Sequence, residues 1–264
     1  MLNSTRNTAP WYAASAPIGL ERKGLFTDIN NQRHAANRRK VASLYSMTTM
    51  LKWEHYTDES TRVLISKFKK HAQSAECINL QLWLQYFAFD TISLITLGKS
   101  FGFVENGRDE HGFLDAIHIY LVYCANVGVY SEFHPILGWL AAKLPSGGIS
   151  WMVGFVQQLC QNRFKEVGPD KFASAPERDF LGTILRMHGQ NLDKILLEDV
   201  TSHSLTNIGA GSDTTSVSLA SIMYHLITSP DSLKRVRQEI DEAAERGQLS
   251  ELITFAEAQK LPFL

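Results

Sequence analysis

The stretch Ala210-Gly211-Ser212-Asp213-Thr214-Thr215 lies inside a run from Thr201 to Ser229 whose only formally charged residue is Asp213. Pro230 closes this run, and no proline interrupts the chain between Glu177 and that residue, so the sequence predicts one long helix. A solvated helix face normally carries Lys, Glu and Arg, whereas this run is small, polar and nearly uncharged. We therefore expect it to face neighbouring helices or a bound ligand.

Helical periodicity divides the run into two sides. One side holds the apolar residues Leu205, Ile208, Leu219 and Ile222. The other side holds Asn207, Ala210, Asp213, Thr214, Val217 and Ser221. A buried carboxylate must be hydrogen-bonded or paired, because otherwise its pKa rises and it becomes a proton carrier near neutral pH. Asp213 is therefore a candidate for proton transfer.

The motif also predicts a notch in the helix. Ala210 and Gly211 lie one turn before Thr214 and Thr215, so two positions with almost no side chain lie beside two hydroxyls. Glycine inside a helix costs about 1 kcal/mol relative to alanine, which indicates close approach by a flat or bulky group. The Thr214 hydroxyl can bond the carbonyl of Ala210 and loosen the helix there. A hydroxyl, a freed carbonyl and an acid together can hold a small ligand and pass it protons.

This pattern resembles the oxygen-activation motif of the long central helix in cytochrome P450 monooxygenases. Ordinary packing of small residues in a helical core is the alternative for the motif taken alone. A second resemblance lies upstream, where His34 and Arg38 share one face of a basic run from Gln32 to Lys40. It is similar to the family's helix that holds the haem propionates, and planar arginine suits a carboxylate. A solvated basic helix end is the alternative for this segment.

The sequence downstream of the motif continues the resemblance. Ser229-Pro230 predicts a helix start, and an apolar stripe then predicts a helix that ends near Gly247. The stripe consists of Leu233, Val236, Ile240 and Ala243. Thr254-Phe-Ala-Glu257 is a capping-box pattern that predicts a further short helix. Lys260 to Leu264 resembles the segment that leads into the family's Glu-x-x-Arg helix. Neither that Glu-x-x-Arg pair nor the Cys thiolate ligand of the haem iron is found in the sequence.

The chain has three cysteines, Cys77, Cys124 and Cys160, each in an apolar helical context. None has the Phe and Gly surroundings of a haem-ligand loop, so we predict buried free thiols. Their number and scatter also argue against a disulfide framework or a zinc site. We assign no metal-ligating residue in this chain.

The remaining sequence predicts a helical body. Asn79 is a candidate cap for a helix that Gly98 ends, and Asp90 near its middle is expected to be a satisfied structural acid. A second helix is expected from Ile149 to Glu166. Turn-rich connectors are expected over Phe101–Asp109 and Val167–Arg178. By resemblance, the region up to Trp139 matches the helices and loop that roof the substrate pocket. Its aromatic residues Tyr120, Tyr123, Tyr130 and Phe133 fit either an apolar cavity lining or ordinary core packing.

The length of the chain and its proportions of hydrophobic and charged residues predict one globular unit. The chain has 264 residues, 44% of them hydrophobic, and a formal net charge of -1, which gives no reason to expect a nucleic-acid partner. The stretch Tyr120 to Tyr130 is too short for a bilayer, which takes about 20 residues. No signal peptide or anchor is visible at the start. We therefore expect residues 1–264 to form a single domain. The resemblance implies that this domain is incomplete, an internal fragment from before the propionate-binding helix to just before the Glu-x-x-Arg helix.

The resemblance implies a mainly α, partial cytochrome P450 fold, a helical body around one long central helix without the haem-thiolate loop. It implies a eukaryotic, microsomal-type and fungal enzyme of secondary metabolism. Intact, such an enzyme inserts one atom of O2 into an apolar small molecule, using haem iron and electrons from NADPH through a P450 reductase. It would lie on the cytosolic face of the endoplasmic reticulum membrane, held by an anchor that this chain lacks.

The resemblance also assigns roles to residues of this sequence. Thr214 would hold bound oxygen or water, and Asp213 would relay protons. Ala210 and Gly211 would let the haem approach closely, while His34 and Arg38 would hold its propionates.

Two other classes of function are kept open. The absent thiolate ligand favours a non-enzymatic helical module that binds an apolar ligand or a partner, and it predicts that the fragment alone is inactive. A hydrolase using Asp213 with His203 or His225 is disfavoured, because each histidine lies more than two helical turns away along the same helix.

Overall fold

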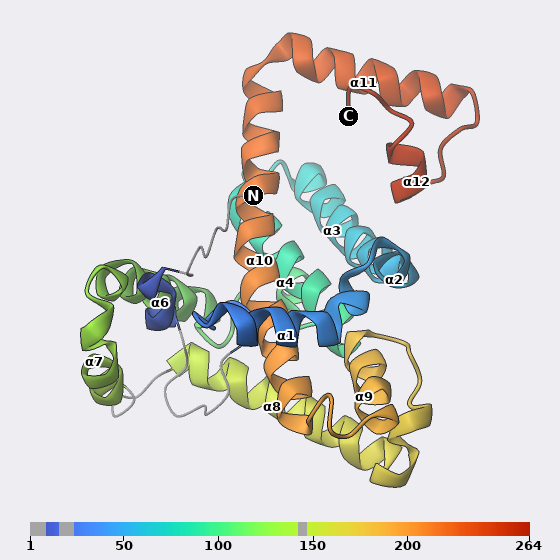
Figure 1. Ribbon diagram of the computed structural model, residues 1–264. Helices are drawn as coiled ribbons and strands as arrows, with labels where there is room; N and C mark the ends of the chain where they lie inside the picture. The colour runs from blue at the N-terminus through green and yellow to red at the C-terminus, as the bar shows by residue number, and fades with distance from the viewer. Residues whose placement is uncertain (1–8, 16–23, 142–146) are drawn as a thin grey trace, which may run out of the picture. The chain divides into compact units, whose positions relative to one another are not determined.

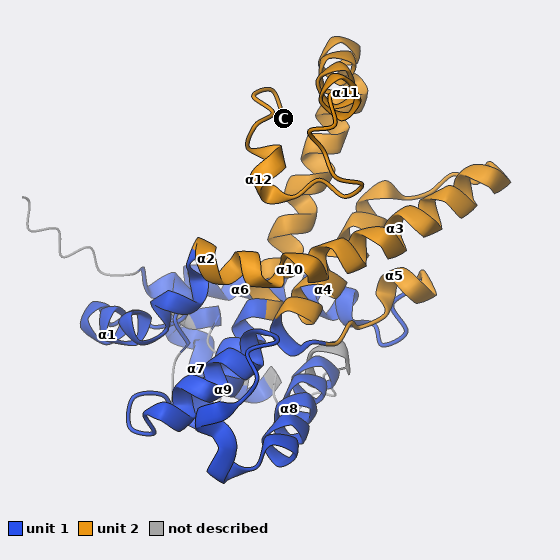
Figure 2. Ribbon diagram, turned by 90° about the vertical axis from the view of Figure 1, so that its right-hand side faces the viewer, with its two compact units in different colours: residues 1–46, 96–98, 108–207 blue, residues 47–95, 99–107, 208–264 orange. Residues whose placement is uncertain are grey.

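A computed structural model describes residues 9–15, 24–141 and 147–264 of the chain. Within these ranges every regular element is a helix, which agrees with the mainly α prediction. The chain divides into two compact units, coloured separately in Figure 2. Unit 1 comprises residues 1–46, 96–98 and 108–207, and unit 2 comprises residues 47–95, 99–107 and 208–264. The expected single domain over 1–264 stays a prediction.

Unit 1 contains helices from both halves of the chain. They are the 3-10 helices η1 (Pro10–Ser15), η2 (Ala42–Tyr45), η4 (Ser131–Phe133) and η5 (Pro169–Ser174), and the α-helices α1 (Asn31–Val41), α6 (Phe113–Val129), α7 (His134–Ala141), α8 (Gly147–Val167) and α9 (Phe180–Gln190). Asn30 caps α1 by accepting the backbone N–H of Arg33 at 2.9 Å. Helices α1 and α8 confirm the predicted basic helix and the predicted helix over 149–166.

The interior of unit 1 is organised around α9 and η5, which pack against each other. Phe172, Ala175 and Leu185 form a buried apolar cluster there. Beside it, Arg163 of α8 donates to the buried carboxylate of Asp179 at 2.8 Å and to the carbonyl of Leu97 at 3.4 Å. Because Asp179 also accepts the N–H of Gly182 at 2.7 Å, one carboxylate both caps α9 and ties it to α8.

Helix α6 packs against η1 and α8. Trp11 of η1 lies so close to Gly128 that a Cβ at this glycine would stand 2.1 Å from the indole Nε1. The hydroxyl of Tyr120 donates to the carbonyl of Ser15 at 2.8 Å.

In the part of the chain that is described, no single helix has the length and apolar composition of a membrane span. Only the sharply bent pair Phe113–Val129 and Ser131–Leu137, at 115°, reaches them together.

Unit 2 contains the remaining helices. They are α2 (Met47–Met50), η3 (Leu51–Trp53), α3 (Glu54–Ser74), α4 (Leu80–Leu97), α5 (Phe103–Asn106), α11 (Pro230–Glu245) and α12 (Phe255–Ala258), with the second part of α10 (Leu197–Thr228). Asn79 caps α4 by accepting the N–H of Leu82 at 3.2 Å, and Gly98 follows the helix with φ +69. Both ends of α4 therefore confirm the sequence prediction.

Asp90 of α4 is a satisfied structural acid, as predicted. Its buried carboxylate accepts the backbone N–H groups of Gly102, Phe103 and Val104 at 2.9, 3.2 and 2.8 Å. Burial raises the pKa of Asp90, and the three backbone donors oppose this shift. The carboxylate thus orders the start of α5, and this helical turn corrects the expectation that residues 101–109 form only a connector.

Helix α10 is the longest element, with 32 residues (Figure 1). It begins at Leu197 and ends at Thr228, two residues before Pro230, and so confirms the single long helix predicted over Thr201–Ser229. Ile208 is fully buried, as its side of the helical wheel predicted, but Ile222 is 56% exposed. The predicted apolar side therefore holds for the middle of the helix and not for its last turns.

Helices α11 and α12 begin where the sequence predicted. Pro230 occupies the first turn of α11, although the Ser229 side chain makes no capping hydrogen bond. Val236 and Ala243 are the buried members of the predicted stripe. Thr254 and Glu257 form the predicted capping box, with the Thr254 N–H donating to the Glu257 carboxylate at 2.9 Å.

Acidification is expected to melt α12 before the rest of unit 2. The hydrogen bond from the Thr254 N–H, helped by Ser250, lowers the pKa of Glu257 from 4.5 to about 2. Because the folded pKa is depressed, the stabilisation is present above pH 4.5 and is lost as the pH falls from 4.5 towards 2. NMR signals of the Thr254 and Glu257 amides should follow this loss. Glu257→Gln should abolish the pH dependence of these signals. Glu251→Gln, which removes an exposed neighbouring carboxylate, should leave the pH dependence unchanged.

Two further expectations were wrong. Cys77 lies between α3 and α4 and is exposed, whereas Cys124 and Cys160 are buried as predicted. The connector predicted over residues 167–178 contains η5, whose Phe172 is buried in the core of unit 1. The Pro and charged residues of this segment gave it a surface composition, but a single aromatic side chain anchors it.

Candidate functional site

One hydrogen bond expected of the predicted notch is present on α10, while the notch as a ligand site stays a prediction. The Thr214 hydroxyl donates to the carbonyl of Ala210 at 2.8 Å. Ala210, Thr214 and Val217 are exposed on the same side of the helix. A Cβ at Gly209 would meet nothing within 4 Å. This face of α10 is therefore small, uncharged and open, with one hydroxyl and one carbonyl already joined on it.

The Asp213 carboxylate is half-buried and hydrogen-bonded to a neutral partner. Its Oδ1 accepts the side-chain amide of Gln85, on α4, at 3.1 Å. No Lys, Arg or His pairs with Asp213 within the described ranges. The sequence gives no signal for Gln85, because an amide within a mostly apolar helix does not reveal a partner 128 residues away.

Gly211 faces α4 and not the open side of α10. A Cβ at this position would lie 3.0 Å from Cγ1 and 3.1 Å from Cδ1 of Ile92. The glycine therefore allows close approach of two helices within unit 2. Its predicted role toward a bound group stays a prediction, while Gly209 and Ala210 are the small residues on the open face.

On α1, the predicted pair His34 and Arg38 lies one turn apart on one face. The neighbouring Arg33 is already engaged, since its Nε and guanidinium donate to Asp28 at 2.6 and 2.7 Å. Arg38 is exposed and has no carboxylate partner among the residues the structure describes. Within this basic helix, Arg38 is thus available to bind an acid.

Tyr45, the last residue of η2, contacts α10. Its hydroxyl donates to the side-chain oxygen of Asn207 at 2.8 Å, and its ring packs near Phe180. Burial raises the pKa of Tyr45 to about 12, so the phenol stays protonated and keeps donating. The sequence placed Asn207 on the polar side of the helix but gave no signal for this partner.

One of the two histidines of the hydrolase alternative, His203, is part of the interior of unit 1. His203 is buried in unit 1 and helps line a cavity of about 20 Å³ with Lys40, Asp199 and Ser202. Burial lowers the pKa of His203, with Lys40 acting in the same direction and Asp199 against it. The imidazole is therefore neutral at pH 7 and belongs to the packing around the first turns of α10.

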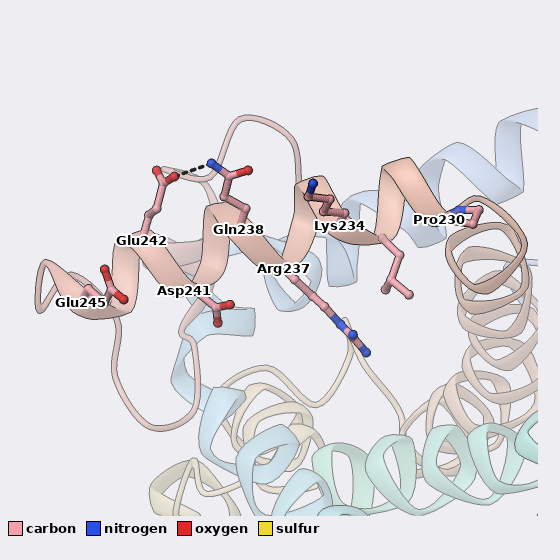
Figure 3. Close-up of a pocket in the computed structure, with 8 residues that line it drawn as sticks. Pro230, Lys234, Arg237, Gln238, Asp241, Glu242 and Glu245 are labelled. Carbon is pink, nitrogen blue, oxygen red and sulfur yellow. Dashed lines mark hydrogen bonds between the residues drawn. The ribbon is translucent and has the colours of Figure 1, made fainter.

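Larger surface hollows occur along α11. One of about 590 Å³ is lined by a mixture of acidic, basic and amide side chains between Pro230 and Glu245 (Figure 3). A second, of about 770 Å³, lies between α11 and α12 and is also of mixed charge. No site residue predicted from the sequence lines either hollow.

The buried cysteine of α8 is a protonated thiol. Burial raises the pKa of Cys160 to about 11, so this side chain is a neutral thiol at pH 7. No cluster of three or more His, Cys, Asp or Glu side chains able to hold a metal ion occurs in the described ranges.

The aromatic residues expected to line a substrate pocket or pack in the core differ in their surroundings. Tyr123 hydrogen-bonds His134 at 2.9 Å, whereas Tyr130 and Phe133 are more than half exposed.

Comparison with known proteins settles the family. The family model for cytochrome P450 matches residues 4–264. The chain belongs to the cytochrome P450 family. Pisatin demethylase of Fusarium vanettenii is 34% identical over 253 residues, covering 94% of this chain and 49% of that protein. Cytochrome P450 monooxygenase gsfF of Penicillium aethiopicum is 29% identical over 251 residues, covering 90% of this chain and 49% of the relative. These fungal relatives confirm the predicted fungal P450 resemblance.

A solved structure confirms the fold. The crystal structure of a cytochrome P450, CYP102L1, matches with a TM-score of 0.71 at 21% identity, covering 97% of this chain and 53% of that chain. The described helices are thus a partial P450 fold, as predicted. The chain spans about half the length of the relatives it matches.

Family membership implies haem iron as the cofactor. Each unit, taken by itself, has side chains whose chemistry suits such a group. The open face at Gly209, Ala210 and Thr214 is small and uncharged, as close approach of a flat macrocycle requires. Arg38, with His34 one turn before it, supplies donors without a competing carboxylate. None of the three cysteines is assigned as the iron ligand.

Proposed function

We propose that the natural protein is a haem-dependent monooxygenase that inserts one oxygen atom of O2 into an apolar organic molecule. The observation that carries this proposal is the Thr214 hydroxyl held on the Ala210 carbonyl at 2.8 Å, next to the Asp213 carboxylate, on an open face of a P450 helix. The names of the relatives, a demethylase and a monooxygenase, favour oxidation of an organic substrate.

The residues of this chain have separate tasks in the proposed reaction. Bound haem supplies the oxidising chemistry. Arg38 and His34 hold the propionates by charge-assisted hydrogen bonds. Thr214, whose proton is directed to the Ala210 carbonyl, presents its oxygen lone pairs to a water or ligand on the open face. Asp213 exchanges protons with solvent, and Ala210 keeps the face small.

The electron source and cellular site follow from the same proposal. We propose that electrons come from NADPH through a P450 reductase. We further propose that the natural protein works at the cytosolic face of the endoplasmic reticulum, in fungal secondary metabolism. Support for these points is the family and the fungal relatives.

Haem retention by paired arginine variants tests the proposal. The natural protein, translated from its whole reading frame, should bind haem and show the Soret band of a thiolate-ligated P450 when reduced under carbon monoxide. Arg38→Ala removes a charge-assisted bond and should weaken haem retention roughly tenfold. Arg39→Ala removes an exposed neighbouring charge on the same helix and should retain haem normally. A natural protein without that band, or equal loss from both variants, would contradict the assignment.

A further inference from the structure

We propose that Gln85 is a positioning residue for the Asp213 carboxylate, a role that rests on the proposed monooxygenase function. The Gln85 amide donates to Oδ1 of Asp213 at 3.1 Å. This bond fixes the rotation of the carboxylate and leaves Oδ2 as the oxygen that takes up and releases the proton.

A second contact joins α4 and α10 beside this pair. Gln85 and Ile92 lie two turns apart on one face of α4, and both contact the motif segment of α10. Ile92 packs against Gly211 so tightly that a Cβ there would lie 3.0 Å from its side chain. The two helices therefore meet at two points, one apolar and one polar, separated by a single residue of α10. The Ile92–Gly211 contact is thus a second tie between the two helices, beside the Gln85–Asp213 hydrogen bond.

The charge environment explains why an amide suits this position. Asp213 is the only formal charge between Thr201 and Ser229, and no cation pairs with it in the described part of the chain. A Lys or Arg partner would bind the ionised carboxylate strongly and oppose its protonation. A neutral amide donor also orients a carboxylate, but it stabilises the ionised form of that carboxylate less than a cation does. Asp213 is thus oriented by a hydrogen bond and not by an ion pair.

The hydrogen-bond count is consistent with this role. Oδ1 is occupied by Gln85, and the Asp213 backbone carbonyl is occupied by the Ser216 hydroxyl at 2.8 Å. The next residue, Thr214, directs its hydroxyl proton to Ala210. Gln85 thereby belongs to the same group of polar atoms as the predicted catalytic pair, although it is on another helix and was not identified from the sequence.

A charge-swap experiment on the natural protein tests the contact without relying on turnover. Gln85→Glu places two carboxylates within hydrogen-bond distance and should lower Tm by several degrees. Asp213→Asn added to Gln85→Glu restores an amide–carboxylate pair with reversed polarity, and should recover most of the loss. Gln81→Glu, at an exposed position one turn earlier on α4, is the matched control and should change Tm little. Additive effects of Gln85→Glu and Asp213→Asn would overturn the contact.

Turnover then tests the positioning role. Gln85→Leu should lower turnover and increase its solvent isotope effect, with product formed per O2 consumed near its original value, because proton delivery becomes slower when the carboxylate is free to rotate. Gln85→Asn, which keeps an amide, should change the isotope effect less. An unchanged isotope effect in Gln85→Leu would overturn the positioning role even if the swap restores Tm. A natural protein that passes the swap test but binds no haem would instead overturn the proposed function, and with it this role.

Discussion

Gly189→Ala is expected to lower the free energy of unfolding by about 3 kcal/mol or more. A Cβ at Gly189, on α9, would lie 2.2 Å from the backbone nitrogen of Ala173 and 2.4 Å from the carbonyl carbon of Phe172. Backbone atoms cannot rotate away as a flexible side chain can, so either α9 or η5 must move. The contact between them holds the buried cluster of Phe172 and Leu185 together.

Thermal unfolding followed by circular dichroism measures this effect. For a chain of this size the expected cost corresponds to a fall in Tm of roughly 6–12 °C. Gly154→Ala is the matched control, because Gly154 is exposed inside α8 and a Cβ there would meet nothing within 4 Å. That variant should stabilise the chain by about 1 kcal/mol, since alanine is the better helix former. Equal Tm values for the two variants would contradict the packing of α9 against η5.

The features that the sequence predicted best depend on residues close together in the chain. The start of α12 follows from Thr254 and Glu257, three positions apart, because a capping box is complete within one turn. The end of α10 follows from Pro230, since proline lacks the N–H that a helix interior needs. The bond from Thr214 to Ala210 is likewise local, as a hydroxyl reaches the carbonyl four residues back within any helix.

The features that the sequence did not predict depend on contacts between distant segments. Gly211 could have faced a ligand or a helix, and only the placement of Ile92 shows that it faces α4. Phe172 lies in a segment of surface composition but is buried by α9. Cys77 has apolar neighbours in sequence, yet it lies in the exposed link between α3 and α4. In each case the neighbouring residues in the sequence limit the possible roles of the side chain. Whether it is buried, and against which element, depends on how distant segments pack.

Asp213→Asn is expected to lower the turnover of the natural haem-bound protein by about 100-fold. The substitution keeps the size of the side chain, and the amide oxygen of asparagine can still accept the Gln85 N–H that Asp213 Oδ1 accepts at 3.1 Å. The packing of α4 on α10 should therefore survive, so Tm should change little while the proton-exchanging group is lost. A rate loss accompanied by a matching loss of Tm would point to misfolding and contradict the relay.

Thr214→Ala, also on α10, should give a different defect from that of Asp213→Asn. It removes the hydroxyl on the open face but leaves Asp213 and Gln85 in place. We expect O2 consumption to continue while less product forms and more peroxide is released, because the group that holds the ligand for protonation is gone. Thr215→Ala, at the next exposed hydroxyl of α10, should leave product and peroxide near their original ratio. Slow but coupled turnover in Asp213→Asn and fast but uncoupled O2 consumption in Thr214→Ala would separate proton supply from ligand positioning. Unchanged coupling in Thr214→Ala would exclude its hydroxyl from both tasks.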